Sequence, residues 1–477
     1  MVSPFAKQAW TILGVLLSMF SQGILMGYTS ILLPSLLDPE SDIKVDLHTA
    51  SWIASAIGMM GIPGFLLSAI LMEMYGRRLP HGLAALPGVV GWLCIYYAKR
   101  VPLLVIGRAL GGLSISISVS TGAIVIGEYA APKHRGMFLN LKTVAVCFGN
   151  MASHILGYYY HWRIIALIGL IPLVASFLIT CTWPESPAWL ASRRRFKESE
   201  ISFYWLRGQT KESTSEIEDL FRAQKERMSN ALTKTSTCFR RMVEFLKKFT
   251  RRDFIKPVLI IMFGCILVES CGRHIFPAFA LQIIEEVTSL RGQSFYYSLG
   301  MDITITTSAL LSSILINYMK RRTLLFGSGI TALLILYSIC GYLYLVNIEV
   351  FPSSPTVPIL MFVIYFIVCN LGCTAIPLAL FGEIFPLAHR GSGGFIAGSL
   401  VSIILTITMQ VTPYLLVNAK VYGTFAILGT VMLLSLIALW ILLPETKDKT
   451  LQEIENYLNY GKYSRDDNEA RLKMIPA

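Results

Sequence analysis

The sequence predicts an all-α membrane protein whose twelve transmembrane helices form two pseudo-symmetric bundles of six. Three observations support this fold class: the composition, the length of the apolar runs and a duplicated string of charged residues. Of the 477 residues, 54% are hydrophobic and only 15% are charged, and the mean hydropathy is +0.59. Soluble globular domains carry about a quarter charged residues, so the composition excludes that class.

Apolar runs of membrane-spanning length fill most of the chain. A helix needs roughly 17 to 25 apolar residues to cross a hydrocarbon core of about 30 Å. Helices are expected throughout, because an open sheet would leave backbone groups unpaired in lipid. The twelve runs lie near 9–33, 50–72, 82–98, 102–127, 138–160, 162–182, 255–285, 294–318, 322–346, 356–384, 392–418 and 420–443. They predict a first bundle over 1–182, a linker over 183–254, a second bundle over 255–443 and a tail over 444–477.

The two halves of the chain share several motifs at nearly one offset. Each half carries a Gly-Glu pair followed by His-Arg-Gly, an Arg-Arg pair and a Pro-Glu pair. The matched segments are Gly127-Glu128 to Gly136 and Gly382-Glu383 to Gly391, Arg77-Arg78 and Arg321-Arg322, and Pro184-Glu185 and Pro444-Glu445. A repeat of this length indicates a duplicated unit. Because each Gly-Glu string closes one apolar run and opens the next, its charges lie where helices leave the bilayer, an arrangement typical of transporters.

Basic residues concentrate in alternate loops rather than over the whole surface. The net charge is +12, and Arg77, Arg135, Arg390 and the 183–254 linker all fall on one side if the N-terminus is cytosolic. This segregation is the signal that sets membrane topology. We therefore expect both termini to be cytosolic, the lipid bilayer to be the partner of the basic residues, and no nucleic acid to bind. The plasma membrane is the expected location.

The linker and the tail carry signals for short cytosolic helices. Ser186 precedes Pro187, the arrangement of a helix cap followed by a proline at the first helical position. After the last apolar run, Thr450 and Glu453 have the spacing of a capping box.

No motif in the chain predicts a cofactor, a metal or a catalytic residue. Eight of the nine cysteines lie in apolar runs without the spacing of metal ligands, so they are expected to be small packing residues without disulfides. There is no phosphate-binding loop and no catalytic triad. We therefore expect no enzymatic activity.

Taken together, the motifs resemble those of the sugar porters of the major facilitator superfamily, and most closely the facilitated trehalose transporters of insects. The resemblance covers nearly the whole chain. It rests on Gly27-Tyr28-Thr29-Ser30, Glu73-x-x-Gly76-Arg77-Arg78, Gly88-x-x-Gly91-Trp92-Leu93, Gly107-Arg108-x-x-Gly111, Pro184-Glu185-Ser186-Pro187, Glu383-Ile384-Phe385-Pro386 and Pro444-Glu445-Thr446-Lys447. It implies a monomer that moves a small organic solute by alternating access, the expected solute being a sugar such as trehalose or a hexose, or a polyol.

The positions that contact sugar in this family differ here. The seventh span reads Val268-Glu269-Ser270-Cys271-Gly272-Arg273-His274 in place of Gln-Gln-Leu-Ser-Gly-x-Asn, the tenth reads Ala375-Ile376-Pro377-Leu378 in place of Pro-x-Pro-Trp, and the eleventh reads Val401-Ser402 in place of Asn-Trp. Sugar sites need amides and hydroxyls that converge on the ligand. Two alternatives therefore stay open: a carrier of a non-sugar solute, and a membrane sensor that keeps the scaffold without transport. The first span lacks the Asp of proton-coupled members near Gly27, which favours facilitated diffusion over proton symport.

The repeated charges form the candidate gate. The resemblance implies that they clasp the two halves at the cytosolic end in one state and separate in the other, through pairs that break within a few kcal/mol. The alternative is that these residues only anchor helix ends. The set comprises Arg77, Glu128, Arg135, Arg321, Glu383 and Arg390.

Polar residues within the apolar runs form the candidate substrate cavity. Ionisable groups at membrane depth are costly and usually face a cavity or a partner. Glu269 and Arg273 are four residues apart, so on one continuous helix they would share a face and pair, while Gly272 and Pro277 indicate a break in that helix. The alternatives are a self-neutralised pair and, for the histidine of the fifth span, a packing role. The candidates are Thr143, His154, Glu269, Arg273, His274 and Asp302.

Overall fold

The computed structural model describes residues 3–231, 252–288, 294–352, 354–384, 390–447, 454 and 457–458. For some of these, including Glu383 and Arg390, it describes only the backbone. Every regular element in these ranges is a helix. The chain divides into two compact units: one contains 1–235, 274–306 and 405–418, and the other contains 236–273, 307–404 and 419–477.

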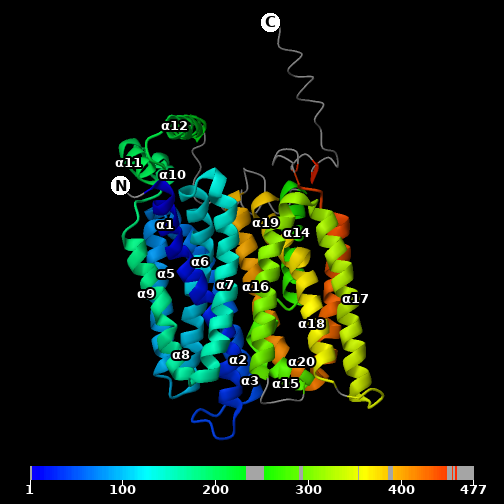
Figure 1. Cartoon of the computed structure of the whole chain (residues 1–477). Coiled ribbons are helices and arrows are strands. Elements are labelled where there is room, and N and C mark those ends of the chain that lie inside the picture. The colour runs from blue at the N-terminus through cyan, green and yellow to red at the C-terminus, as the bar shows by residue number, and fades with distance from the viewer. Residues whose placement is uncertain are drawn as a thin grey trace. The chain divides into compact units, whose positions relative to one another are not determined.

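The first unit holds the helices of the N-terminal half. In Figure 1, α10 to α12 lie at the same end of this unit as the start of α1, and α2 and α3 lie at its opposite end. The helices are α1 (Pro4–Gly27), α2 (Thr29–Leu37), α3 (Leu47–Met59), α4 (Gly61–Tyr75), α5 (Arg78–Tyr96), α6 (Val101–Tyr129), α7 (Pro132–Tyr159), α8 (Trp162–Ile168), α9 (Leu170–Cys181), α10 (Pro187–Ser192), α11 (Phe196–Arg207) and α12 (Lys211–Ala231). This unit also includes α15 (Ile275–Thr288) and parts of α16 and α20.

The second unit is built from the remaining helices of the C-terminal half. They are α14 (Arg252–Ser270), the second part of α16 (Ser294–Tyr318), α17 (Arg321–Asn347), α18 (Thr356–Cys369), the π-helix η1 (Asn370–Thr374), α19 (Ala375–Glu383) and the rest of α20 (Arg390–Leu442). A π-helix adds one residue to a turn and interrupts the regular α-helical ladder. The tenth predicted apolar run is therefore three consecutive helical pieces.

Ten helical stretches in the described part of the chain are long and apolar enough to cross a membrane. They are Pro4–Leu37, Leu47–Tyr75, Arg78–Tyr96, Val101–Tyr129, Trp162–Cys181, Phe254–Thr288, Ser294–Ile316, Arg321–Asn347, Thr356–Leu380 and Gly393–Leu442. The prediction of an all-helical membrane protein is confirmed. The sequence predicted twelve spans, and the difference from these ten stretches comes from two helices.

The first difference is α7, which covers the predicted run 138–160 except for its last residue and is absent from the ten stretches. It contains Lys133, Arg135 and Lys142 and is therefore less apolar. The second is α20, which joins the two last predicted runs. Its backbone leaves the helical region at Lys420 (φ 56°, ψ −178°), between those runs.

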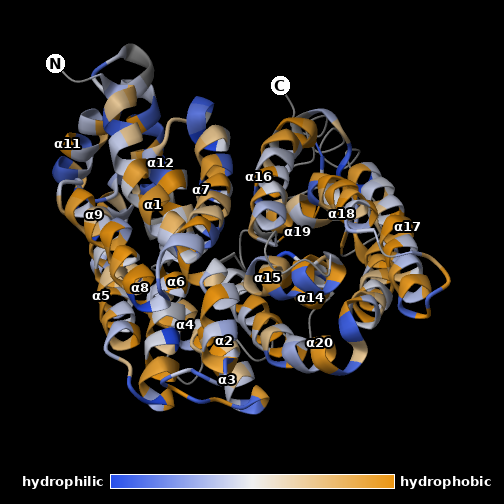
Figure 2. Cartoon of the chain, turned by 60° about the horizontal axis from the view of Figure 1, so that its bottom comes forward, coloured by the Kyte–Doolittle hydropathy of each residue, from blue (hydrophilic) through white to orange (hydrophobic). Residues whose placement is uncertain are grey.

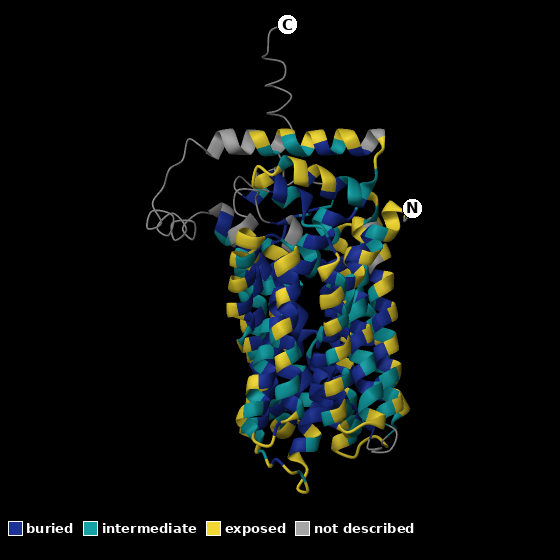
Figure 3. Ribbon diagram, turned by 90° about the vertical axis from the view of Figure 1, so that its left-hand side faces the viewer, coloured by how far each residue is buried: buried dark blue, intermediate teal, exposed yellow. Residues whose placement is uncertain are grey.

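Apolar side chains cover the outward flanks of the long helices. Ile171 and Leu178 on α9 are 64% and 61% exposed, and Ile441 at the end of α20 is 75% exposed. Figure 2 shows hydrophobic residues along α5, α9 and α17, and Figure 3 shows exposed residues along the helix flanks. Large exposed apolar surface on a helix suits contact with lipid rather than water.

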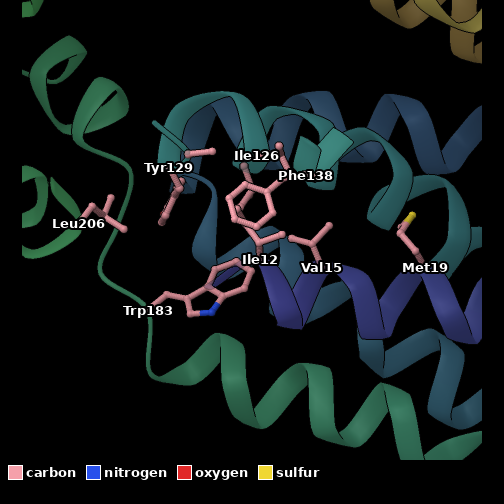
Figure 4. Close-up of a cluster of buried hydrophobic side chains, with 10 residues drawn as sticks. Ile12, Val15, Met19, Ile126, Tyr129, Phe138, Trp183 and Leu206 are labelled. Carbon is pink, nitrogen blue, oxygen red and sulfur yellow. The ribbon is translucent and has the colours of Figure 1, made fainter. Parts of the chain in front are cut away.

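A buried cluster fixes the start of the linker to the first unit. In Figure 4 the Trp183 ring lies beside Ile12 and Val15 of α1, and Ile126 and Tyr129 of α6 belong to the same cluster. The Tyr129 hydroxyl also donates a hydrogen bond to the Pro184 carbonyl, at 2.9 Å. The segment that follows α9 is therefore held against α1 and α6 where the linker begins.

The predicted cap of the first linker helix is confirmed. The Ser186 hydroxyl accepts the Trp189 N–H at 3.2 Å, and α10 begins at Pro187. The capping box predicted at 450–453 lies outside the described residues.

Candidate functional site

Arg77 and Glu128 form an ion pair at the linker end of the first unit. The guanidinium donates from Nη2 to Oε1 at 2.8 Å and from Nε to Oε2 at 3.0 Å, a two-pronged geometry. The pair is half-buried, with 18% and 19% of the two side chains exposed. The Ser186 hydroxyl donates to the same carboxylate, so three segments of the chain meet at Glu128.

Glu185 binds the turn that places Arg77. Its carboxylate accepts the backbone N–H of Arg77 at 2.7 Å and that of Arg78 at 3.3 Å. Gly76 has φ +94°, and a Cβ built there would overlap this carboxylate, so the turn requires glycine. Burial raises the pKa of Glu185, although the N–H groups that it accepts act in the opposite direction.

The second unit repeats this arrangement. Glu445 accepts the backbone N–H of Arg321 at 2.9 Å and that of Arg322 at 3.0 Å. The guanidinium groups match as well: Arg77 donates to the carbonyl of Met72, and Arg321 donates to the carbonyl of Ile316, each five residues earlier. The duplication read from the sequence therefore extends to the hydrogen bonds at the helix starts.

The other members of the predicted gate are less fully defined. Arg135 is exposed and forms no ion pair among the described residues. The side chains of Glu383 and Arg390 lie outside the described part of the structure. The structure thus brings Arg77 and Glu128 together, and leaves a gate formed by all six residues as a prediction.

His154 and Asp302, both predicted cavity residues, meet inside the first unit. His154 Nδ1 of α7 lies 2.6 Å from Asp302 Oδ2 of α16, and the side chains are 0% and 3% exposed. His154 Nε2 lies 3.1 Å from the Pro277 carbonyl of α15. One imidazole therefore connects three helices that the sequence assigns to different halves.

This geometry fixes the number of protons in the contact. A carbonyl oxygen only accepts hydrogen bonds, so Nε2 must carry a proton. The 2.6 Å contact then needs a second proton between Nδ1 and Oδ2, giving either an imidazolium with a carboxylate or a neutral imidazole with a carboxylic acid. Both forms are neutral overall, which suits a buried site.

A cavity of about 630 Å³ opens in the same unit, within the 300–1,000 Å³ range of small-molecule sites. Its wall combines apolar side chains with hydroxyl, amide and carboxyl groups. The polar residues are Thr29, Ser30, Gln282, Glu285, Glu286 and Ser294. None of the six predicted cavity residues lines it. The sequence signal that could have indicated this cavity is the motif Gly27-Tyr28-Thr29-Ser30, whose last two residues line it.

Three further polar residues of α1 and α7 have buried atoms without a hydrogen-bond partner in the described structure: Gln22 Oε1, Asn150 Oδ1 and Ser153 Oγ. A buried polar atom left unpaired costs roughly 1–3 kcal/mol. A solute that carries hydroxyl groups would satisfy such atoms. The sequence analysis did not single out these residues.

Arg108 is another candidate functional residue, which the sequence indicated only as part of a family motif. Its side chain is fully buried in α6 and donates to the Leu25 carbonyl at 2.8 Å and to the Thr29 hydroxyl. Among the described residues it forms no ion pair with a carboxylate. The guanidinium therefore holds the end of α1 and the start of α2 through neutral acceptors.

The remaining predicted cavity residues are dispersed. Thr143 is half-buried on α7, and Glu269 is buried in the last turn of α14. The helix break predicted at Gly272 is confirmed, because α14 ends at Ser270 and Gly272 has φ +82°. The expectation that Glu269 and Arg273 share one helix face is wrong for the same reason. Arg273 and His274, both half-buried, follow the break.

Comparisons with known proteins agree on one family. The model of the family described as "Sugar (and other) transporter" matches residues 6–458. A facilitated trehalose transporter of Apis mellifera ligustica is 26% identical, over 99% of this chain and 92% of that protein. One from Drosophila grimshawi is 28% identical over 98% of this chain but only 49% of its own length.

Solved structures show the same fold. The inward-open xylose transporter XylE from E. coli aligns with a TM-score of 0.74 at 19% identity, covering 95% of this chain and 99% of that one. The proton:xylose symporter XylE bound to 6-bromo-6-deoxy-D-glucose aligns with a TM-score of 0.73 at 18% identity, over the same shares. The helices, the duplicated caps and the family match lead to one conclusion: this chain belongs to the sugar transporter family, whose members are multi-pass membrane transport proteins and not enzymes.

Proposed function

We propose that the protein carries a sugar or a polyol across the plasma membrane by alternating access, as a facilitator and as a monomer. In this proposal twelve spans form two six-helix bundles, with α7 as the fifth span and the break at Lys420 separating the last two. Both termini are cytosolic. The relatives named as trehalose transporters support trehalose as the first solute to test.

The observation that carries the proposal is the contact between His154 and Asp302. It joins α7 of the first sequence copy to α16 of the second through one short polar contact. A transporter that opens between its halves must break and remake such contacts, and each state must remain within a few kcal/mol of the other. A shared proton provides a contact that is strong when formed and electrically neutral.

The polar groups of α1, α7 and the cavity support a hydroxylated solute. Hydroxyl groups both donate and accept, so they suit the cavity carboxylates of Glu285 and Glu286 and the unpaired atoms of Gln22 and Asn150. The amides that the family places in the seventh span are absent here. Recognition of glucose should therefore be weak, because missing hydrogen-bond partners cost a polar site orders of magnitude in specificity.

The contacts of Arg108 support facilitated diffusion. A symporter needs a group that gains and loses a proton during the cycle, and the first span has no carboxylate near Gly27 for that role. Beside this position Arg108 is held by carbonyl and hydroxyl oxygens, which carry no charge. Uptake should therefore persist without a proton gradient.

We further propose that Arg77, Glu128, Arg135, Arg321, Glu383 and Arg390 act as the cytosolic gate. The matched placement of Arg77 and Arg321 on Glu185 and Glu445 supports equivalent roles in the two halves.

Counterflow in proteoliposomes tests the function. Vesicles preloaded with unlabelled trehalose, glucose or sorbitol would receive the labelled solute outside, with and without a protonophore. We expect saturable exchange of trehalose or sorbitol above that of glucose, unchanged by the protonophore. Asp302→Asn should reduce exchange, and Leu66→Trp, on an exposed position of α4, should not. A folded protein that exchanges none of a broad set of solutes would instead support the sensor alternative.

A further inference from the structure

Three cysteine side chains converge inside the second unit. The Sγ atoms of Cys271, Cys369 and Cys373 all lie within 4.8 Å of one another, the only such group of possible metal ligands among the described residues. The residues are 2%, 1% and 0% exposed. The sequence spacing gives no sign of this arrangement, because 98 and 102 positions separate Cys271 from Cys369 and Cys373.

Each thiol lies at an irregular point of the backbone. Cys271 follows the last residue of α14 and precedes Gly272, whose φ is +82°. Cys369 ends α18, and Cys373 lies in the π-helix η1. The Tyr365 hydroxyl donates to the Cys271 carbonyl at 3.2 Å and connects the two segments. Wide helical turns of this kind often mark functional sites.

A fourth sulfur lies next to one of the three thiols. Met432 Sδ of α20 lies 4.0 Å from Cys271 Sγ. Ligands held about 2.3 Å from a tetrahedral metal are about 3.8 Å apart. The cysteine sulfurs, within 4.8 Å of one another, would therefore need to approach by about 1 Å or less. The side chains can supply this movement without a change of fold.

The ligand set selects the ion. Thiolate and thioether sulfur select soft ions, of which Cu(I) and zinc are the common ones. Zinc in proteins is bound by Cys, His and carboxylate ligands, and the methionine thioether is not among them. Three cysteines with one methionine therefore favour Cu(I) over zinc.

We propose that Cys271, Cys369 and Cys373, together with Met432, form a binding site for Cu(I). Each cysteine that binds as a thiolate releases one proton, and the bound ion connects the end of α14 to α18, η1 and α20 within the second unit. The proposal does not depend on the identity of the transported solute. Cys265 and Cys340 are also buried but lie outside the group, so they provide matched controls.

A competition titration tests the site. The purified full chain, reduced and kept without oxygen, would be titrated with Cu(I) against a chromophoric Cu(I) chelator. We expect one ion per protein, with the affinity reduced at least tenfold in Cys369→Ser with Cys373→Ser, and unchanged in Cys265→Ser with Cys340→Ser. Equal retention by both double variants would overturn the proposal, as would a preference for Zn(II) over Cu(I).

X-ray absorption on the loaded wild-type protein gives a second measurement that does not depend on the folding of a variant. A first shell made only of sulfur, at about 2.3 Å, is expected. A shell of nitrogen or oxygen would place the ion elsewhere and rule out this site.

Discussion

His154 Nδ1 and Asp302 Oδ2 are 2.6 Å apart in the apolar interior of the first unit, and the other imidazole nitrogen faces the Pro277 carbonyl. Each group is expensive to bury alone. Together they satisfy each other and leave no net charge. The contact therefore connects two helices, and replacing either side chain should have a large effect on the stability of the protein.

Removing one partner should destabilise the protein more than removing both. Asp302→Leu or His154→Phe leaves a buried polar group unmatched, and such losses typically cost about 3–5 kcal/mol. His154→Phe with Asp302→Leu should recover part of that loss, because neither polar group remains. Thermal unfolding of the four proteins in detergent measures the coupling. Asp42→Asn, at an exposed carboxylate, is the control. Strictly additive losses would contradict the pairing.

Gly76→Ala should destabilise the first unit. The position has φ +94°, and the added Cβ would overlap the Glu185 carboxylate. A residue held in such a region costs roughly 1–3 kcal/mol before the overlap is counted. Gly127→Ala in α6 is the matched control, since a Cβ there meets nothing within 4 Å and alanine favours the helix by about 0.5–1 kcal/mol. Equal melting temperatures for the two variants would contradict this account of the turn.

The pH dependence of stability should differ in sign between two glutamates. Burial raises the pKa of Glu185 above its ordinary 4.5, so the folded protein holds this proton more tightly than the unfolded chain. Its stabilising contribution is complete below about 4.5 and is lost as the pH rises through the raised pKa. The melting temperature of the wild type minus that of Glu185→Gln should therefore be larger at acidic than at neutral pH.

Glu198 provides the opposite case. A hydrogen bond from Arg195, at 2.7 Å, lowers the pKa of this exposed carboxyl. Its contribution is present above the ordinary pKa and is lost as the pH falls through the lowered one. For Glu198→Gln the difference from wild type should shrink on acidification. The same trend in both variants would contradict the assignment of burial as the dominant effect at Glu185.

The sequence predicted local features better than contacts between distant helices. The cap at Ser186, the break at Gly272 and the repeated Arg-Arg and Pro-Glu pairs depend on neighbouring residues or on the duplication, and the structure contains them. His154 and Asp302 were each candidates, but their contact depends on how two helices rotate against each other. The expectation that Glu269 and Arg273 share one helix face is wrong, because it assumed a continuous helix through Gly272. The three-cysteine group had no local signal at all.

The cavity of the first unit should control solute exchange without controlling stability. Leu37 lines the cavity and is 44% exposed, so a tryptophan there would reduce the space for a solute while leaving the core intact. Leu37→Trp should lower the maximal rate of counterflow and keep the melting temperature of the wild type. Leu66→Trp makes the same change at a 47% exposed position of α4 that does not line the cavity, and it should exchange normally. If both variants exchange at the wild-type rate, the cavity lies off the transport path. If Leu37→Trp instead lowers the melting temperature and the rate in parallel, the cavity wall serves stability rather than passage.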